Sequence, residues 1–426
     1  MKKTMVSFKR VLISLIFVGI WWSIGFGAGA TGNIKIQPYI TVYEEFNDNI
    51  DLTSRNQKSD FITTISPEIK MSGSDKTYGL DFDYKAGFVF YSTNTEYNYI
   101  SHLGKLNAFY RLNPKWTVRI KDDFVQSQEP LEGSSSMTMP ESQPYSSINR
   151  GRAVYSRNIV EPSVEYQFGK EDRVSLAYRN NMYQTQNQLS QNSQENAVKM
   201  NLTYWLNIKN GITFDYSYAQ GDFERSPDLI SHSAIFRYTY RLNPRTSFFG
   251  EYAFQANELN SPGIDYIVHN PLIGIDHAFT QTLSGSAQFG YFWKNSDSGT
   301  ASGYTYRAGL AKKTQRTTYL LYVQGGYSQD YFTPENLGFI QYHKAEGKIT
   351  YQPIKRIVLG FSGWLESVES ESKRKDLFWG ISGQASYQLY QWLDISLEIS
   401  HRLNDSNVDF YSFEENKAIV KITATY

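Results

Sequence analysis

The sequence has no cysteine, which excludes disulfide scaffolds, thiolate metal sites, iron–sulfur clusters, cysteine nucleophiles and lipoprotein anchors. It has no charge excess either, because 42 lysines and arginines balance 42 aspartates and glutamates. A basic nucleic-acid-binding protein is therefore excluded. The six histidines are scattered along the chain, so we expect neither a metal centre nor a cofactor. Beyond the N-terminal region no run of about 18 apolar residues would allow a helical membrane span.

The N-terminal region has the three parts of a secretory signal: a basic start, an apolar stretch at 11–27 and the small residues Ala28-Gly29-Ala30. We expect residues 1–30 to be a cleaved signal peptide and residues 31–426 to form one domain. An uncleaved N-terminal membrane anchor is the alternative. Removal of this segment leaves 38 basic against 42 acidic residues, a mature net charge of −4.

Aromatic residues are abundant, with 33 tyrosines, 26 phenylalanines and 8 tryptophans, and most of them alternate with polar residues. In residues 77–91 the even positions carry Tyr, Leu, Phe, Tyr, Ala, Phe and Phe, whereas Asp81, Asp83 and Lys85 occupy odd positions. A period of two places these sets on opposite faces of a strand. The same alternation recurs through most of the chain. No helical segment capable of covering a sheet is evident.

Connections between these segments form two alternating series, nine of them short and ten mostly longer. Tyr-Arg-Leu-Asn-Pro occurs at 110–114 and again at 240–244, each time between two alternating segments. Nineteen connections predict 20 antiparallel strands with both ends on one side, and 18 is the alternative count. Long strands, an even strand number and unequal connections are typical of a transmembrane β-barrel of the bacterial outer membrane. The barrel must close, because an open edge in hydrocarbon leaves backbone groups unpaired.

Side chains on the polar face would line the lumen. By parity this face carries 19 basic and 12 acidic residues, and such a basic wall would favour anionic solutes. The alternative is that mixed charges hydrate the wall and pair with each other. Trp205, Phe292 and Trp364 share this face and would form a sugar-binding slide or fill space. The candidate pore-lining residues are Asp81, Asp83, Arg119, Lys121, Arg179, Trp205, Arg237, Arg241, Arg307 and Trp364.

The longest connection, Glu129–Arg150, contains three prolines and a run of serines. It joins the fifth and sixth predicted strands. In general porins, which the barrel pattern resembles, the corresponding loop folds inward and narrows the pore. Glu129, Glu132 and Glu141 would then face the basic wall across a constriction; a loop that stays outside is the alternative.

Catalysis finds little support in the sequence. Ser101 and His102 are adjacent, so they fall on opposite faces of one strand. No H-E-x-x-H or G-x-S-x-G motif is present, and His277 falls on the apolar face, where a place in the aromatic belt is expected. The acidic segment Asp48–Asp51 lacks the spacing of an EF-hand, and we interpret it as loop-capping.

Two segments resemble a known family. Tyr-Glu-Glu-Phe-Asn-Asp-Asn-Ile at 43–50 and Asp-Phe-Ile-Thr-Thr-Ile-Ser-Pro at 60–67 are similar to the opening of the putative β-barrel porins, a group that includes barrels found with exopolysaccharide-export systems. The resemblance implies an outer-membrane barrel with a channel or export role. The aromatic C-terminal residue, Tyr426, resembles the signal read by the outer-membrane barrel assembly machinery.

The sequence therefore predicts an outer-membrane channel of a Gram-negative bacterium for passive passage of hydrophilic solutes, with oligosaccharide or exopolysaccharide as candidate cargo. A structural or surface-display barrel without transport is the alternative, and an enzyme is not expected. The expected partners are outer-membrane lipids and lipopolysaccharide, the assembly machinery, the solute, and a periplasmic export partner. No nucleic-acid partner is expected.

Overall fold

A computed structural model describes residues 34–129, 151–297 and 299–426, which form twenty antiparallel strands. The predicted signal peptide, residues 1–30, lies outside the described residues. The strands are β1 (Lys35–Asn47), β2 (Asp60–Ser74), β3 (Tyr78–Tyr91), β4 (Tyr99–Arg111), β5 (Trp116–Ser127), β6 (Tyr155–Gln167), β7 (Arg173–Thr185), β8 (Ser193–Trp205), β9 (Asn210–Phe223), β10 (Leu229–Asn243), β11 (Thr246–Leu259), β12 (Tyr266–Ala278), β13 (Leu283–Ser296), β14 (Gly299–Lys313), β15 (Thr317–Asp330), β16 (Gly338–Ile354), β17 (Ile357–Ser370), β18 (Lys375–Tyr390), β19 (Leu393–Ser406) and β20 (Phe413–Thr425).

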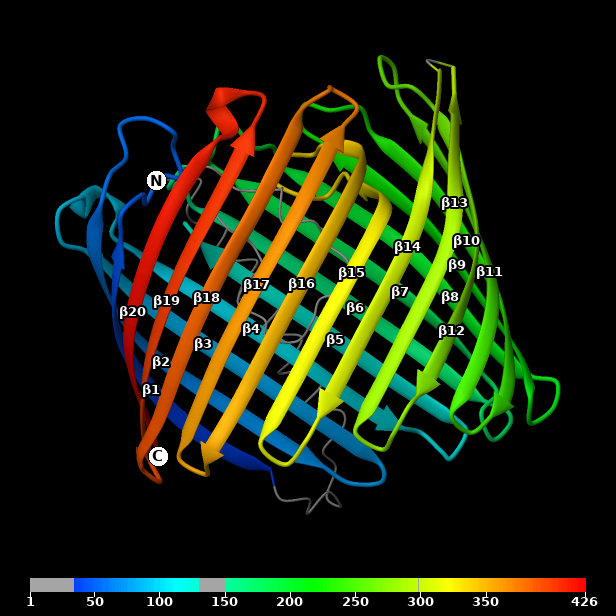
Figure 1. Cartoon of the computed structure of the whole chain (residues 1–426), viewed down its shortest axis with the longest axis horizontal. Coiled ribbons are helices and arrows are strands. Elements are labelled where there is room, and N and C mark those ends of the chain that lie inside the picture. Colours follow the sequence, from blue (N-terminus) through cyan, green and yellow to red (C-terminus); the bar gives the residue numbers. More distant parts are fainter. Residues whose placement is uncertain (1–33, 130–150, 298) are drawn as a thin grey trace.

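The sheet closes on itself to form a barrel (Figure 1). Each strand pairs with its neighbours in sequence, and β1 pairs with β20 from Tyr39↔Thr425 to Asn47↔Lys417. The predicted fold class and the count of 20 strands are therefore confirmed. The barrel strands leave no free edge, as a sheet in hydrocarbon requires.

Short turns join the strands at one rim, called here the turn side. Asparagine side chains shape several of them: the Asn113 side chain accepts from the backbone N–H of Lys115 at 2.9 Å and of Trp116 at 3.1 Å. In the same way, the side chains of Asn207 and Asn243 each accept, at 2.9 Å, from the backbone N–H of the residue two positions later in the chain. Such Asx turns stabilise a tight reversal without any partner from another element. The longer connections all lie at the opposite rim, the loop side.

Contacts between distant strands identify the inner face. Lys199 of β8 reaches Glu161 of β6 at 2.8 Å, and Phe223 of β9 lies 5.4 Å, centroid to centroid, from Phe332 in the loop after β15. Side chains of the opposite parity are apolar and exposed, for example Ile273 at 71% and Ile399 at 57%. That face is the lipid-facing surface of a membrane barrel.

The described helices are two 3-10 turns of three residues each, Thr95–Tyr97 and Asp409–Tyr411. Neither they nor any other described segment forms an apolar helix of membrane-spanning length.

Candidate functional site: the barrel interior

From near the turn side to mid-height, the interior wall carries alternating charges. In the register of β2 to β5, Lys70 faces Asp83, Asp83 faces Lys105, and Lys105 faces Asp123. Lys70 also approaches Glu68 at 2.8 Å. Opposite charges directly across a sheet attract each other. The candidate residue Asp83 thus lies within a charge ladder, with Asp81 and Lys121 exposed on the same face.

Several of the predicted arginines on the inner wall are paired with carboxylates. Arg237 donates from Nε to Glu251 at 2.6 Å, and Arg241 lies 2.7 Å from Glu171 in the β6–β7 turn. The other ion pairs of the candidate arginines are Arg119–Glu165 at 3.9 Å and Arg179–Glu195 at 3.4 Å. Arg307 lies over the ring of Tyr322. These pairings match the alternative expectation of a wall of mixed, mutually paired charges.

The predicted basic excess of the inner wall is too large. Seven acidic residues that parity had not counted also lie on the inner face, most of them near the loop side, where a strand and its connection are hard to separate in sequence. They reduce the excess of seven without removing it, because the basic residues Lys35, Arg157 and Lys313 on the same face were not counted either. The uncounted acids are Glu45, Asp60, Glu195, Glu251, Asp330, Asp376 and Glu415.

The three inward aromatic residues do not form a row. Trp205 ends β8 at the turn side, where the Arg241 guanidinium lies 3.4 Å from its ring centroid. Trp364 of β17 packs against Phe378 at 4.4 Å. Phe292 of β13 is 1% exposed and belongs to an apolar cluster. Because each ring packs within its own surroundings, the space-filling alternative fits these residues and the sugar slide does not.

At the loop side, the tip of the β15–β16 hairpin folds into the barrel. We call residues 326–341 the hairpin tip. The β14–β15 ladder ends at Tyr306↔Gly325, and Gly326 adopts a φ of +149°, a conformation that favours glycine. In Figure 1 the upper part of yellow β15 bends away from β14 towards the middle of the barrel. The hairpin tip thus separates from β14 and bends into the interior, while Ile340 and Gln341 at its end still pair with β17.

The hairpin tip contacts strands on the far side of β14. The Tyr331 hydroxyl lies 2.8 Å from that of Tyr266 in β12, and the Tyr327 ring lies 4.9 Å from that of Phe292. The Phe332 carbonyl accepts from Arg157 of β6 at 3.3 Å. Burial among these apolar groups raises the pKa of Tyr331 to about 12. The hairpin tip therefore spans the interior and packs on both sides.

A buried arginine fixes the hairpin tip to the β17–β18 loop. Arg374 lies 2.8 Å from Glu335 and 2.7 Å from Asp376, and its guanidinium lies 3.6 Å from the Tyr411 ring centroid. Burial lowers the pKa of Arg374, but the carboxylates of Glu335 and Asp376 more than offset this and hold it above its ordinary value. A charge buried in this way is stable only while its partners remain.

A second packed layer lies beside the hairpin tip. Leu52, in the β1–β2 loop, is 1% exposed and packs with Phe378 and Phe413. Its neighbour Ile50 is fully buried, and the Ile50 carbonyl accepts from Arg152 Nε at 2.7 Å. The β1–β2 loop and the segment around Arg152, far apart in sequence, therefore pack together at the loop side.

The prediction for the loop Glu129–Arg150 can be followed only at its base. Glu132 and Glu141 lie outside the described residues. Glu129 lies 3.1 Å from Arg152; burial raises the pKa of Glu129, whereas Arg152 and Lys417 lower it below its ordinary value. Glu129 thus pairs with the arginine at the other end of its own loop. Among the described residues the inward elements are the hairpin tip and the β1–β2 loop. The only sequence signal at the hairpin tip is a polar Thr-Pro connection.

The residues weighed for catalysis stay apart. Ser101 faces Gly87 on the inner surface, while His102 lies on the outer surface beside the Tyr84 hydroxyl at 2.8 Å. His277 lies on the outer surface against Phe279. Within the described ranges no three histidine, aspartate or glutamate side chains gather as metal ligands.

The acidic segment after β1 caps loops, as expected. Asp48 accepts from the backbone N–H and the side-chain amide of Asn416, both at 2.7 Å. Asn49 accepts from the N–H of Thr53 at 3.0 Å. These bonds tie the β1–β2 loop to β20.

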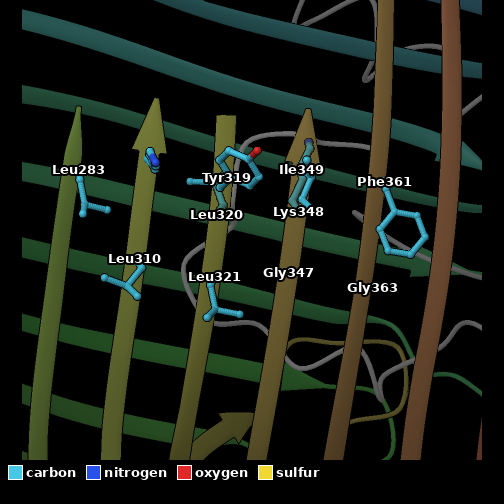
Figure 2. Close-up of a pocket in the computed structure, with 11 residues that line it drawn as sticks. Leu283, Leu310, Tyr319, Leu320, Leu321, Gly347, Lys348, Ile349, Phe361 and Gly363 are labelled. Carbon is cyan, nitrogen blue, oxygen red and sulfur yellow. The ribbon is translucent and has the colours of Figure 1, made fainter. Parts of the chain in front are cut away.

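A shallow apolar hollow lies outside the lumen. Figure 2 shows Leu310, Leu321 and Phe361 around Gly347 and Gly363, on the lipid-facing surface of β14 to β17. Glycines leave space there between larger side chains. Its apolar lining is that of a surface against acyl chains rather than of a site for a hydrophilic solute.

A closed barrel with a charged interior and an apolar exterior defines a porin-like protein of the Gram-negative outer membrane. Comparison with known proteins agrees. Residues 227–426, which hold β10 to β20, match the family described as "Putative beta-barrel porin 2", so the predicted resemblance is confirmed over this part of the chain. The segments at 43–50 and 60–67 lie outside the match. No curated protein matches the sequence.

Two solved outer-membrane barrels, PirA and FrpB, share the fold at low sequence identity. The siderophore receptor PirA of Pseudomonas aeruginosa is 8% identical, with a TM-score of 0.52 over 92% of this chain and 80% of PirA. The FrpB iron transporter of Neisseria meningitidis is 8% identical, with a TM-score of 0.51 over 93% of this chain and 83% of FrpB. P. aeruginosa OpdK, solved with vanillate, is 8% identical, with a TM-score of 0.42 over 92% of this chain and 99% of OpdK.

Proposed function

We propose that the protein is an outer-membrane channel for passive passage of small hydrophilic solutes, and that the hairpin tip closes it at the loop side. The observation that carries this proposal is the contrast within the lumen. The turn-side wall is charged and exposed, as in Asp81 and Lys121, whereas Phe339 and Val268 at the loop side are 2% and 0% exposed. A hydrated wall conducts solutes, and the packed layer must move before a solute crosses.

The geometry supports a small cargo rather than a polysaccharide. The inward rings of Trp205 and Trp364 stand on β8 and β17 without forming a continuous path, and the paired charges on the described wall give little preference for one sign. Passage is therefore by diffusion along hydrated side chains. Such diffusion needs no periplasmic export partner. Recognition of Tyr426, which directly follows β20, by the outer-membrane barrel assembly machinery is a separate proposal.

Solute entry into vesicles tests the function. The barrel reconstituted in liposomes is diluted into solutions of small neutral, anionic and cationic solutes, and swelling is followed by light scattering. We expect slow entry with wild type and at least tenfold faster entry when residues 329–339 are replaced by Asn-Gly, a two-residue hairpin turn between the paired residues Ser328 and Ile340. Leu189→Ala, at an exposed position on the same rim, is the control and should behave as wild type.

A specific observation also favours the second candidate, a structural barrel without transport: the loop-side layer buries apolar side chains as a protein core does, with Phe292 and Phe339 at 1% and 2% exposure. A shortened variant that folds, as judged by its heat-modifiable gel mobility, yet admits no solute would establish that alternative and overturn the channel.

A further inference from the structure

A ring of paired polar side chains surrounds most of the lipid-facing surface near the loop side. We call these residues the polar ring. In seven loop-side hairpins a polar side chain of the first strand bonds the fourth residue of the second. The pairs are Glu44–Thr63 at 2.6 Å, Tyr84–His102 at 2.8 Å, Asp122–Asn158 at 2.6 Å, Tyr178–Asn196 at 2.7 Å, Tyr216–His232 at 2.9 Å, Tyr252–His269 at 2.7 Å and Tyr291–Ser302 at 2.7 Å.

Two further pairs extend the polar ring. His401 of β19 bonds Asn416, the fourth residue of β20, at 2.8 Å. His343 of β16 bonds Tyr306 at 3.0 Å and lies two residues lower, where the hairpin tip has left the wall. On β18 the fourth residue faces inward, and Trp379 stands next to it on the outside, 4.8 Å from His401. Five of the six histidines of the chain therefore belong to the polar ring.

The pairs repeat one geometry. Tyr84 stands two residues before Ala86, the residue directly opposite His102. The same diagonal offset recurs in the pairs Asp122–Asn158, Tyr178–Asn196, Tyr216–His232, Tyr252–His269 and Tyr291–Ser302. A diagonal neighbour lies within reach of an aromatic side chain. Six hairpins with one offset indicate a feature that follows the barrel's circumference rather than six unrelated bonds.

Below the polar ring the outer surface is apolar. On β10 the outward residues after His232 are Ala234, Phe236, Tyr238 and Tyr240, and on β20 those after Asn416 are Ala418, Val420, Ile422 and Ala424. About ten residues separate the polar ring from the turn side. At a rise of about 3.3 Å per residue and a tilt of about 40°, this span is about 25 Å high, which matches the apolar band of an outer-membrane barrel.

Above the polar ring the surface is mixed. One outward position higher are Ile100, Ile230 and Ile267, but also Ser156, Gln194 and Glu414. This position is about 5 Å higher on the tilted strand, and the interfacial zone of a bilayer is itself about 5 to 8 Å deep. The polar ring therefore stands at the lower edge of that zone.

We infer that the polar ring is the surface that binds the loop-side lipid leaflet at the level where acyl chains join the headgroups. A tyrosine hydroxyl that donates to histidine Nδ1 leaves Nε2–H as an outward donor. Carbonyl oxygens of acyl esters and amides are the acceptors at this level. Polar side chains deeper in hydrocarbon would be costly, and the hydrogen bonds within each pair reduce that cost at the boundary. The polar ring thus fixes the height of the barrel in the membrane, whatever crosses its lumen.

The cysteine-free chain allows a direct test of depth on one strand. Thr300, Ser302, Tyr304 and Ala308 all face outward on β14. Each is replaced singly by cysteine in the full chain, labelled with a small fluorophore and reconstituted in vesicles containing lipids with a quencher at the headgroup, high on the chain or at mid-chain. Iodide in the buffer reports access to water. Labels at 302 and 304 bracket the boundary, since the two positions differ by about 5 Å in height.

We expect the label at 302 to be quenched most by the headgroup quencher, the label at 308 by the mid-chain quencher, and only the label at 300 strongly by iodide. Strongest mid-chain quenching at 302 would place the polar ring in hydrocarbon and overturn the inference. Equal iodide quenching at 300, 302 and 304 would overturn it by placing the polar ring in water.

A second variant tests the pairs themselves. His232→Leu, with Tyr216→Leu, removes one polar pair and extends the apolar surface upward, so the barrel should settle lower and the label at 302 should shift towards the mid-chain quencher. Phe236→Leu, within the apolar band, is the control and should leave the quenching profile unchanged. An unshifted profile after three such pair replacements would show that the polar ring does not set the height.

Discussion

The two ends of the barrel interior are built from the same alternating strands but differ in what covers them. At the turn side, tight Asx turns keep the chain at the rim, and charged residues such as Asp81 and Lys121 remain exposed. At the loop side, the hairpin tip and the β1–β2 loop turn inward and bury Ile50, Phe292 and Ile340 to 1% exposure or less. The alternation of strands thus defines a wall, whereas the connections decide whether the lumen is filled.

Removal of the arginine that fixes the hairpin tip should have the largest effect on stability. Arg374→Met leaves Glu335 and Asp376 without their buried partner, and breaking such a pair costs about 3–5 kcal/mol. Unfolding of the reconstituted barrel in guanidinium, followed by tryptophan fluorescence, measures the loss. Lys375→Met is the matched control: its pair with Glu369 at 3.3 Å is exposed and is worth less than about 1 kcal/mol. Equal losses for both variants would contradict the buried anchor.

A smaller loss of stability is expected from a substitution within the hairpin tip. Phe332→Ala removes the ring that stacks on Phe223 across the interior, and truncation of a partly buried phenylalanine costs about 2 kcal/mol. The same unfolding measurement should show this loss together with faster solute entry. Leu189→Ala should change neither quantity. Faster entry without any loss of stability would mean that the ring blocks the lumen without packing in it.

Acid should weaken the pair at the base of the Glu129–Arg150 loop. The pKa of Glu129 is lowered in the folded protein, so its contribution to stability is present above the unfolded value of about 4.3 and is lost as the pH falls through the folded value. At pH 7 Glu129→Gln should be less stable than wild type, and the difference should narrow below about pH 4. A difference that stays constant with pH would show that the carboxylate charge does not stabilise this pair.

The smallest effect is expected at the turn side. Arg237 and Arg241 already pair with Glu251 and Glu171, so replacing both arginines by Gln should change the anion preference little. Reversal potentials in a salt gradient, measured on the hairpin-shortened channel, test this. A clear loss of anion preference would instead support the prediction, made from the count of wall charges, that a basic wall favours anions.

Sequence periodicity was enough to predict the strand number and both series of connections, because a period of two is a local property. Periodicity failed to predict the features that depend on contacts between residues far apart in sequence. Glu45 and Glu415 look like loop residues in sequence, yet they lie on inward strand positions beside Lys417. The inward turn of the hairpin tip depends on Tyr266 and Phe223, which are remote in sequence. The polar ring does have a sequence signal: aligning the hairpins at their loops brings the tyrosines and histidines into register.

Single-channel conductance in a planar bilayer tests the central claim most directly, that the hairpin tip closes a hydrated lumen. Wild type should show small or rare openings, and the variant with residues 329–339 replaced by Asn-Gly should show steady conductance several times larger. Equal conductance in the two proteins, with both barrels folded, would contradict the account by showing that the hairpin tip does not close the lumen.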